Sequence, residues 1–276
     1  MSDYTSFTVT TEGGVAELVL GNAAKMNALG PSFWQELPQA VAKLNQEGTV
    51  RALIISSTGS LFCSGIDLTM FANPSLTSVA APAERERLKH LILQLQASLT
   101  CLQDCRFPVI AAVQGACLGA GLDLISACDL RYGTTDSFYV VQEINIGIMA
   151  DLGSLQRLPR LLPDAVVREL CFTGAKLSAE RAYNLGFLNA TAQTHEEVLA
   201  AARQAANLIA QRSPLPIAAS KDVLNYSANH TESDALNYCA TVQSAIFEPA
   251  EVMAQVMAMK NKTRHESKDL LAMKAI

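Results

Sequence analysis

The chain has no cluster of positive charge and no long apolar run. Its 21 Lys and Arg residues are outnumbered by 26 Asp and Glu, which gives a formal net charge of -5. Nucleic-acid binding draws on clustered cations, and here they are scattered. A membrane-spanning helix needs about 20 consecutive apolar residues, which no segment supplies. We therefore expect no nucleic-acid partner and no membrane contact.

The sequence also lacks cysteines and histidines at the close spacings that metal sites use. The 7 cysteines form no CxxC pair and are odd in number. Most lie in apolar runs, as is typical of reduced cysteines in a protein core. The 4 histidines lie far apart along the chain. These spacings predict neither a disulfide framework nor a metal site.

No targeting signal is recognised at either end of the sequence. Met1–Thr11 has no charged segment followed by an apolar one, as a secretory signal requires, and its acidic residues are unlike those of a transit peptide. The C-terminal Lys274-Ala275-Ile276 is not a peroxisomal address. Together with the reduced cysteines, these features favour a cytoplasmic protein.

What the sequence does contain is enough apolar residues for a large core, 50% of 276 residues. Phe7–Thr11 and Val15–Leu20 alternate around Gly13-Gly14, which predicts a β-hairpin. Ala52–Ser57 and Val109–Val113 are apolar strands with helices between them, a pattern typical of a parallel sheet in an α/β core. Further elements are predicted as helices at Pro31 to about Gln46, Ala81–Asp104 and about Ala120–Ala127, and as short strands at Leu130–Gly133 and Phe138–Val141.

The last part of the chain is predicted to be almost entirely helical from Ala165 onwards. The longest of these helices are expected at His195–Arg212, Pro216–Tyr226, Glu232–Ala245 and Pro249–Asn261. We divide the chain into a core at 1–195, which carries the site, and a helical region at 196–276. No linker separates them, so we expect the two regions to pack as one unit.

Two of the predicted strands lead into loops of small residues. The loops are Cys63-Ser64-Gly65-Ile66-Asp67 and Gly115-Ala116-Cys117-Leu118-Gly119-Ala120-Gly121. Glycine lets backbone N–H groups face a ligand, and two such groups on one carbonyl oxygen would make an oxyanion hole. The helix N-terminus at Ala120 would strengthen the second donor. Alternatively, Gly119 and Gly121 only let a helix pack closely on the sheet.

Three acidic residues, Asp123, Glu143 and Asp151, lie in apolar surroundings near these loops. Asp123 falls in the first turn of an apolar helix, where a carboxylate is costly unless it has a partner or a function. Each has an ordinary alternative: Asp123 complements a helix dipole, Glu143 is a solvated strand end, and Asp151 caps the next helix. Among weaker candidates, Lys25 is either a loop lysine or a point charge for a phosphate. Asp129 with Arg131 is interpreted as a structural pair.

Taken together, these segments resemble the enoyl-CoA hydratase/isomerase superfamily, the crotonase-like proteins, over essentially the whole chain. The matching segments are Lys25-Met26-Asn27-Ala28-Leu29, Phe62-Cys63-Ser64-Gly65-Ile66-Asp67-Leu68, Pro108-Val109-Ile110-Ala111-Ala112-Val113-Gln114-Gly115, Gly119-Ala120-Gly121 and Cys128-Asp129-Leu130-Arg131-Tyr132. The resemblance implies a ClpP/crotonase spiral of ββα units, a C-terminal trimerisation region, and a homotrimer or dimer of trimers.

The same resemblance implies an acyl-CoA thioester substrate and no separate cofactor, because coenzyme A is part of the substrate. It implies oxyanion donors from the N–H groups of Ile66 and Ala120. The substrate-binding positions that it implies are Lys25, Ala28, Ser64, Gly65, Asp67 and Leu68.

Within the superfamily, Gln142–Pro159 is most similar to the Δ3,5-Δ2,4-dienoyl-CoA isomerases, whose acidic positions fall on Asp123, Glu143 and Asp151. The hydratases have glycine at the position of Asp151. The resemblance implies that Glu143 takes a proton from C2 of a 3,5-dienoyl thioester and that Asp151 gives one to C6, with Asp123 tuning Glu143. Two alternatives stay open: a 2-enoyl-CoA hydratase, and a non-catalytic binding protein on the same fold.

Overall fold

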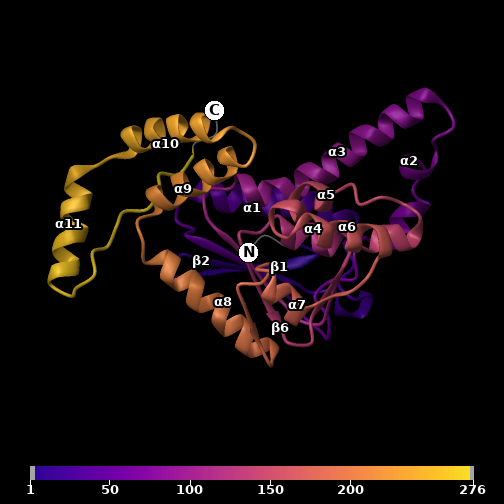
Figure 1. The fold of residues 1–276 in the computed structure, drawn as a ribbon, viewed down its shortest axis with the longest axis horizontal. Coiled ribbons are helices and arrows are strands. Elements are labelled where there is room, and N and C mark those ends of the chain that lie inside the picture. The colour runs from indigo at the N-terminus through magenta and orange to yellow at the C-terminus, as the bar shows by residue number, and fades with distance from the viewer. Residues whose placement is uncertain (1–3, 274–276) are drawn as a thin grey trace.

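A six-stranded sheet forms the centre of the molecule in the computed structural model, which describes residues 4–273 (Figure 1). The strand order is β1-β2-β3-β4-β6-β9. These strands are β1 (Phe7–Glu12), β2 (Val15–Leu20), β3 (Ala52–Ser57), β4 (Val109–Val113), β6 (Leu130–Thr134) and β9 (Ala190–Ala192). The C-terminal Lys274-Ala275-Ile276 and the first three residues of Met1–Thr11 lie outside the described residues.

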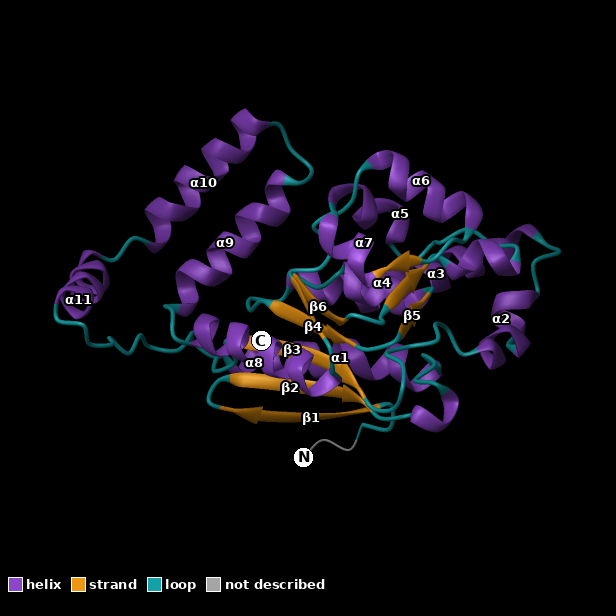
Figure 2. Cartoon of the chain, turned by 60° about the horizontal axis from the view of Figure 1, so that its bottom comes forward, coloured by secondary structure: helices purple, strands orange, loops and turns teal. Residues whose placement is uncertain are grey.

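The pairing of the strands follows the predicted α/β pattern. β1 and β2 form the antiparallel hairpin, with Phe7 opposite Leu20 and Glu12 opposite Val15. Every other neighbour in this sheet pairs in parallel. Figure 2 shows β1 to β4 and β6 side by side. The predicted hairpin and parallel core are therefore confirmed.

A second, three-stranded sheet joins β5 (Ala116–Leu118), β7 (Phe138–Val140) and β8 (Leu177–Ser178). The sequence predicted β7 but neither β5 nor β8, and β9 was also missed. The region after Ala165, predicted to be almost entirely helical, also contains β8 and β9. These strands have two or three residues, too few to display an alternating pattern, so only their partners in the fold define them.

Helices surround the sheets. The α-helices are α1 (Pro31–Glu47), α2 (Pro74–Thr77), α3 (Pro82–Asp104), α4 (Ala120–Ser126), α5 (Ser154–Arg157), α6 (Asp164–Thr173), α7 (Ala179–Asn184), α8 (His195–Ala210), α9 (Pro214–Ser227), α10 (Glu232–Ile246) and α11 (Pro249–Lys260). Short 3₁₀ helices are η1 (Ala23–Lys25), η2 (Leu68–Ala72), η3 (Gln142–Ile146) and η4 (Leu158–Arg160). Within residues 4–273, none of the helices has the length and apolar character needed to cross a bilayer.

The central strands are buried on both faces, which explains their continuous apolar sequence. In β3, Leu53 and Ile55 belong to the larger core with α1, α3 and α4. Ala52 and Ile54 belong to a second core, where α8 covers the sheet with Val198, Ala202 and Ala206. The side chains of β3 alternate between these two cores, as the pleat of a strand requires.

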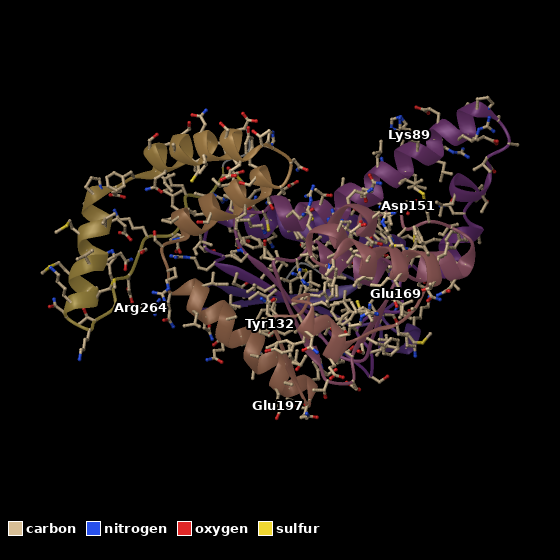
Figure 3. All side chains as sticks on the ribbon, in the orientation of Figure 1. Lys89, Tyr132, Asp151, Glu169, Glu197 and Arg264 are labelled. Carbon is tan, nitrogen blue, oxygen red and sulfur yellow. The ribbon has the colours of Figure 1, made fainter. Side chains whose placement is uncertain are left out.

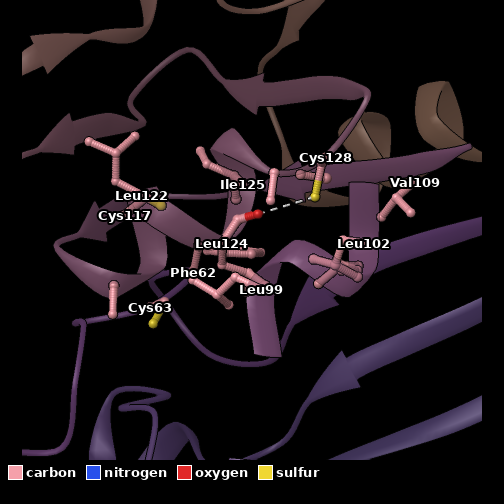
Figure 4. Close-up of a cluster of buried hydrophobic side chains, with 14 of the residues drawn as sticks. Phe62, Cys63, Leu99, Leu102, Val109, Cys117, Leu122, Leu124, Ile125 and Cys128 are labelled. Carbon is pink, nitrogen blue, oxygen red and sulfur yellow. Dashed lines mark hydrogen bonds between the residues drawn. The ribbon is translucent and has the colours of Figure 1, made fainter. Parts of the chain in front are cut away.

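The larger core extends into the loops of small residues, since it includes Cys63 and Cys117 from them (Figure 4). It contains Phe62, Leu99 and Leu122, together with four fully or almost fully buried cysteines, Cys63, Cys105, Cys117 and Cys128. The Cys128 thiol donates to the Leu124 carbonyl at 3.5 Å. All 7 cysteines are free.

The helices α9, α10 and α11 lie to one side of the sheet, away from the projecting start of α3 (Figure 1). A buried lysine of α9, Lys221, ties this region to the core. Its ammonium donates to the Leu102 carbonyl at 2.7 Å, to the Phe107 carbonyl at 2.9 Å and to the Asp129 carboxylate at 2.8 Å. The boundary at 195/196 stays a prediction.

The predicted pairing of Asp129 with Arg131 is wrong, because Lys221 is the ion-pair partner of Asp129. The guanidinium of Arg131 instead donates to the backbone carbonyls of Phe187 and Cys128, at 2.8 and 2.6 Å. Charge spacing along the sequence did not reveal a partner 92 positions away.

Candidate active site

The two loops of small residues lie against each other because β5 pairs with the first loop. The Cys63 N–H donates to the Ala116 carbonyl at 3.2 Å, and the Leu118 N–H donates to the Cys63 carbonyl at 2.9 Å. Cys63 and Cys117 form an isolated parallel bridge. The segments that the oxyanion hypothesis requires are therefore neighbours.

Glycine at position 65 lets the backbones of these loops approach closely. Gly65 has a φ of +102°, and a Cβ there would lie 3.1 Å from the Leu118 carbonyl oxygen and 3.8 Å from the Ala120 nitrogen. The first loop is also fixed to Leu29, whose N–H donates to the Gly65 carbonyl at 2.8 Å. Within residues 4–273, the backbone hydrogen bonds leave the N–H groups of Ile66 and Ala120 without an acceptor. Both groups are free to donate to a ligand.

The two glycines of the second loop have different roles. A Cβ at Gly121 would lie 2.8 Å from the Cβ of Cys63, so this glycine allows close packing, as the structural alternative proposed. Gly119 has a φ of +49°, and a Cβ there would lie 3.0 Å from a carboxylate oxygen of Glu143. Gly119 therefore borders the acidic residues directly.

Asp123 is completely buried in the first turn of α4. One carboxylate oxygen accepts from the Ser154 N–H at 2.6 Å, and the other has no hydrogen-bond partner among the described residues. Burial raises the pKa of Asp123 to about 6, although the Ser154 hydrogen bond and the charge of Arg157 oppose this shift. Complementing a helix dipole does not require such burial, so this alternative does not account for the position.

Glu143 is half-buried in η3, not at a strand end as the sequence suggested. The 3₁₀ turn brings its carboxylate against Gly119. Burial raises the pKa of Glu143 to about 7, with a further contribution from repulsion by Asp123. A carboxyl group with this pKa is poised to exchange protons near neutral pH.

Asp151 is half-buried in the turn before α5, and Figure 3 marks it near α3. It does not cap α5, because that helix has Gly153 at its N-cap without a side-chain hydrogen bond. Burial raises the pKa of Asp151. Its charge in turn raises the pKa values of Asp123 and Glu143, so the three carboxyl groups interact.

Five of the six predicted substrate-binding positions fall into two groups. Lys25, Ala28 and Asp67 line one cavity of about 210 Å³, where the Lys25 ammonium lies 3.7 Å from the Asp67 carboxylate. Ser64 and Gly65 lie on the loop beside Ala120.

The remaining predicted position, Leu68, is 67% exposed at the start of η2. Asp67 also caps η2 by accepting from the Thr69 N–H at 2.9 Å. The carboxylate of Asp67 therefore has a structural role that the sequence did not reveal.

Three polar residues that support the acidic group were missed by sequence reasoning: Gln96, Ser154 and Arg157. Gln96 of α3 donates to the Asp151 backbone carbonyl at 2.6 Å. Arg157 is only 9% exposed. Nothing in the sequence of the short segment Ser154–Arg157 indicates that its arginine is buried. The burial of Arg157 becomes evident only once α3 packs on this segment. Among residues 4–273, no group of three His, Cys, Asp or Glu side chains is arranged to hold a metal ion.

Solved structures with this arrangement of elements include an enoyl-CoA hydratase from Polaromonas sp. JS666. It superposes with a TM-score of 0.85 at 27% identity, covering 95% of this chain and 99% of that one. A putative enoyl-CoA hydratase from Streptomyces coelicolor A3(2) superposes with a TM-score of 0.88 at 24% identity, which shows the fold alone. The predicted crotonase fold is thereby confirmed.

Relatives of known sequence include the mitochondrial Delta(3,5)-Delta(2,4)-dienoyl-CoA isomerase of Mus musculus, 35% identical over 94% of this chain and 81% of its own length. The peroxisomal enzyme of the same name from Arabidopsis thaliana is 36% identical over 92% of this chain and 93% of its own length. These compartments contradict the predicted cytoplasmic location. Reduced cysteines occur in any compartment that keeps thiols reduced, so they did not identify the cytosol.

The family model described as enoyl-CoA hydratase/isomerase matches residues 10–268, almost the whole chain. This match agrees with the two loops, the strand order and the superposed structures. The chain belongs to the enoyl-CoA hydratase/isomerase family.

Proposed function

We propose that this enzyme isomerises 3,5-dienoyl-CoA thioesters to the conjugated 2,4-dienoyl form. The free N–H groups of Ile66 and Ala120 would bind the thioester oxygen, where negative charge develops when C2 loses a proton. The relatives named as dienoyl-CoA isomerases support this substrate class. No separate cofactor is needed, since the thioester itself stabilises the charge.

In this mechanism, the ionised Glu143 removes a proton from C2 and the protonated Asp151 delivers one to C6. The C2–H electron pair becomes the 2,3 double bond, the 3,4 pair moves to 4,5, and the 5,6 pair forms the new C6–H bond. A proton must then pass from Glu143 to Asp151 before the next turnover. Mutual repulsion of buried carboxyl groups favours a state with one group ionised and one protonated, which this mechanism requires of Glu143 and Asp151.

The observation that carries the proposal is the burial of Asp123 beside two further carboxyl groups with raised pKa values. A binding protein has no need of three costly acids in one place. The test is to offer the purified enzyme a 3,5-dienoyl-CoA and, separately, a 2-enoyl-CoA. We expect growth of the conjugated-diene absorbance with the first substrate.

The runner-up is a 2-enoyl-CoA hydratase, in which Asp123 and Glu143 would activate water. The hydratase named among the superposed structures supports keeping this alternative. Loss of the enoyl absorbance with the second substrate, and no change with the first, would establish hydration. Absence of change in both assays would favour a binding protein.

A variant of Asp151 distinguishes the two reactions, because Asp151 donates a proton in the proposed isomerisation and has no role in hydration. We predict that Asp151→Asn lowers kcat for isomerisation by about 10² to 10⁴-fold, the usual contribution of a general acid, and leaves KM close to that of the wild type. Asp164→Asn is the matched control, since Asp164 is an exposed residue of α6 that pairs with Arg168. Full isomerase activity in Asp151→Asn would refute the assignment.

We also propose that the enzyme assembles as a homotrimer or a dimer of trimers through its helical C-terminal region. The helices α9 to α11, with the residue that follows α10, carry large apolar side chains that are each more than half exposed in the single chain: Leu224, Leu236, Phe247, Met253 and Met259. A subunit interface would remove exposed apolar surface of this kind from water. Sedimentation equilibrium of the purified protein measures the assembly, and a monomer would refute it.

A further inference from the structure

The guanidinium of Arg157 is buried between α3 and the turn that carries Asp151. Its Nε donates to the Gln103 side-chain oxygen at 2.9 Å, Nη1 donates to the Leu152 carbonyl at 3.0 Å, and Nη2 donates to the Thr100 hydroxyl at 2.9 Å. All three acceptors are uncharged. No ion pair of the described residues includes Arg157. A buried cation without a direct counterion is costly, so its charge must be balanced at longer range.

The turn from Asp151 to Ser154 packs directly on this guanidinium. Gly153 has a φ of +129°, and a Cβ there would lie 1.8 Å from Nη1 of Arg157, so a side chain at this position would displace the guanidinium. The next N–H, that of Ser154, donates to the Asp123 carboxylate at 2.6 Å. At the start of the turn, Gln96 holds the Asp151 carbonyl.

These contacts come from one face of α3, because Gln96, Thr100 and Gln103 are spaced by four and three residues. The helix therefore holds the first two residues of the turn, Asp151 directly and Leu152 through Arg157. One turn thus connects the proposed proton donor with the buried Asp123 carboxyl.

The charged groups around Arg157 come from three elements. Burial lowers the pKa of Arg157, the charges of Asp123 on α4 and of Asp104 at the end of α3 and the Cys128 thiol oppose this shift, and Arg160 of η4 adds to it. Asp123 is the completely buried acid in this set, and the charge of Arg157 lowers the pKa of Asp123 against the effect of burial. The two buried charges stabilise each other across the Ser154 turn.

We propose that Arg157 is a positioning residue of the active site: its guanidinium fixes the Asp151–Ser154 turn on α3, and its positive charge stabilises the Asp123 carboxylate. This role rests on the proposed function, because it assigns Asp151 and Asp123 to the reaction. Arg157 itself touches neither the substrate nor the reacting atoms.

The test compares Arg157→Gln, which removes the charge, with Arg157→Lys, which keeps it but loses the three-way hydrogen bonding. In Arg157→Gln we expect the pKa of Asp123, about 6 in the wild type, to rise by about one unit, because the nearby positive charge is lost. In Arg157→Lys this pKa stays in place while kcat falls about tenfold, since the turn is less firmly held. Arg160→Gln is the matched control, because Arg160 is exposed and binds Asn229, and it should keep the wild-type pKa of Asp123 and the wild-type kcat.

A readout without substrate separates this proposal from the isomerase assignment. Carboxyl ¹³C NMR titration of Asp123 should show a higher midpoint in Arg157→Gln than in the wild type and in Arg157→Lys. If the wild type hydrates instead of isomerising, the titration still tests the positive-charge role. An unchanged midpoint in folded Arg157→Gln, or an equal shift in Arg157→Lys, overturns the proposal.

If Arg157→Gln does not fold, Thr100→Val decides the positioning role, because it removes a single acceptor and keeps the charge. We expect a several-fold lower kcat with the pKa of Asp123 unchanged. A wild-type kcat in Thr100→Val, with Arg157→Lys also unchanged, overturns the proposal.

Discussion

Asp123 is the residue where stability and chemistry conflict. Its pKa in the folded protein is about 6, whereas the pKa of an aspartate in the unfolded chain is about 3.9. Between these values the folded state holds a proton that the unfolded state has lost, so the free energy of unfolding falls as the pH rises through this window. Above pH 6 the full cost of ionising a buried acid is present.

We therefore predict that Asp123→Asn stabilises the protein at pH 8 by on the order of 2 kcal/mol, because the amide keeps an oxygen for the Ser154 N–H and carries no charge. The gain should disappear at pH 4, where Asp123 is protonated in the folded state. Urea unfolding at both pH values measures the difference. Equal stability of the two proteins at pH 8 would contradict this account, and activity should be lost in either case.

At this scale the sequence predicted which acids to examine but not how they are held. Asp123, Glu143 and Asp151 were singled out from their apolar surroundings and from a family resemblance. Their assigned roles stay predictions. The partners Ser154 and Arg157 could not be predicted, because polar residues in a short segment look like surface residues until a helix from elsewhere packs on them. Gln96 of that helix, α3, was missed because its sequence pattern does not show which turn the helix contacts.

Among the elements, the pairing of β5 with the first loop brings together the segments that carry the N–H groups of Ile66 and Ala120. Gly121 maintains this arrangement by letting α4 pack on Cys63. A larger residue at that position would push the first loop away from Ala120. The geometry of the donor pair thus depends on a contact made by side chains outside it.

We predict that Gly121→Ala destabilises the protein by about 1–3 kcal/mol, the usual cost of overpacking. It should also lower kcat by about 10² to 10³-fold, the effect of losing one oxyanion donor. Gly21→Ala is the control, because no atom lies within reach of a Cβ at Gly21 and its φ is not positive. Near-wild-type kcat in folded Gly121→Ala would show that the donors are not aligned by this contact.

Elements with strong periodicity were predicted well, whereas those defined by their partners were not. The helix predicted at Ala81–Asp104 is α3, with its start shifted by one residue to Pro82. The strands β5, β8 and β9 were missed. These strands of two or three residues are stabilised only by neighbouring strands in the folded protein, so no local sequence pattern predicts them.

For the whole molecule, Lys221 joins the C-terminal helices to the core. We predict that Lys221→Met costs about 3 kcal/mol of unfolding free energy, because it leaves the Asp129 carboxylate and two backbone carbonyls without their buried donor. Adding Asp129→Asn should recover part of the loss, since no unpaired charge then remains. Urea unfolding of the two single variants and the double variant measures the coupling, and additive effects would argue against a shared interaction.

The family fold was predictable from the sequence because many short segments of the chain agree with one pattern, and the superposed structures confirm it. The arrangement of α9 to α11 beside the core could not be predicted from the sequence, since the pattern that identifies a helix does not show where in the fold that helix packs. Lys221 lies in an ordinary helical segment, and its partners Leu102, Phe107 and Asp129 are brought to it only by the folded core.

The two sides of α3 have a joint consequence. Leu95, Leu99 and Leu102 are buried in the larger core, while Gln96, Thr100 and Gln103 hold the turn of the active site. One helix, about 34 Å long, both packs in the core and supports the active-site turn. We therefore expect that heat does not disorder the active site while the core stays folded. Inactivation and global melting of this enzyme should therefore coincide in temperature.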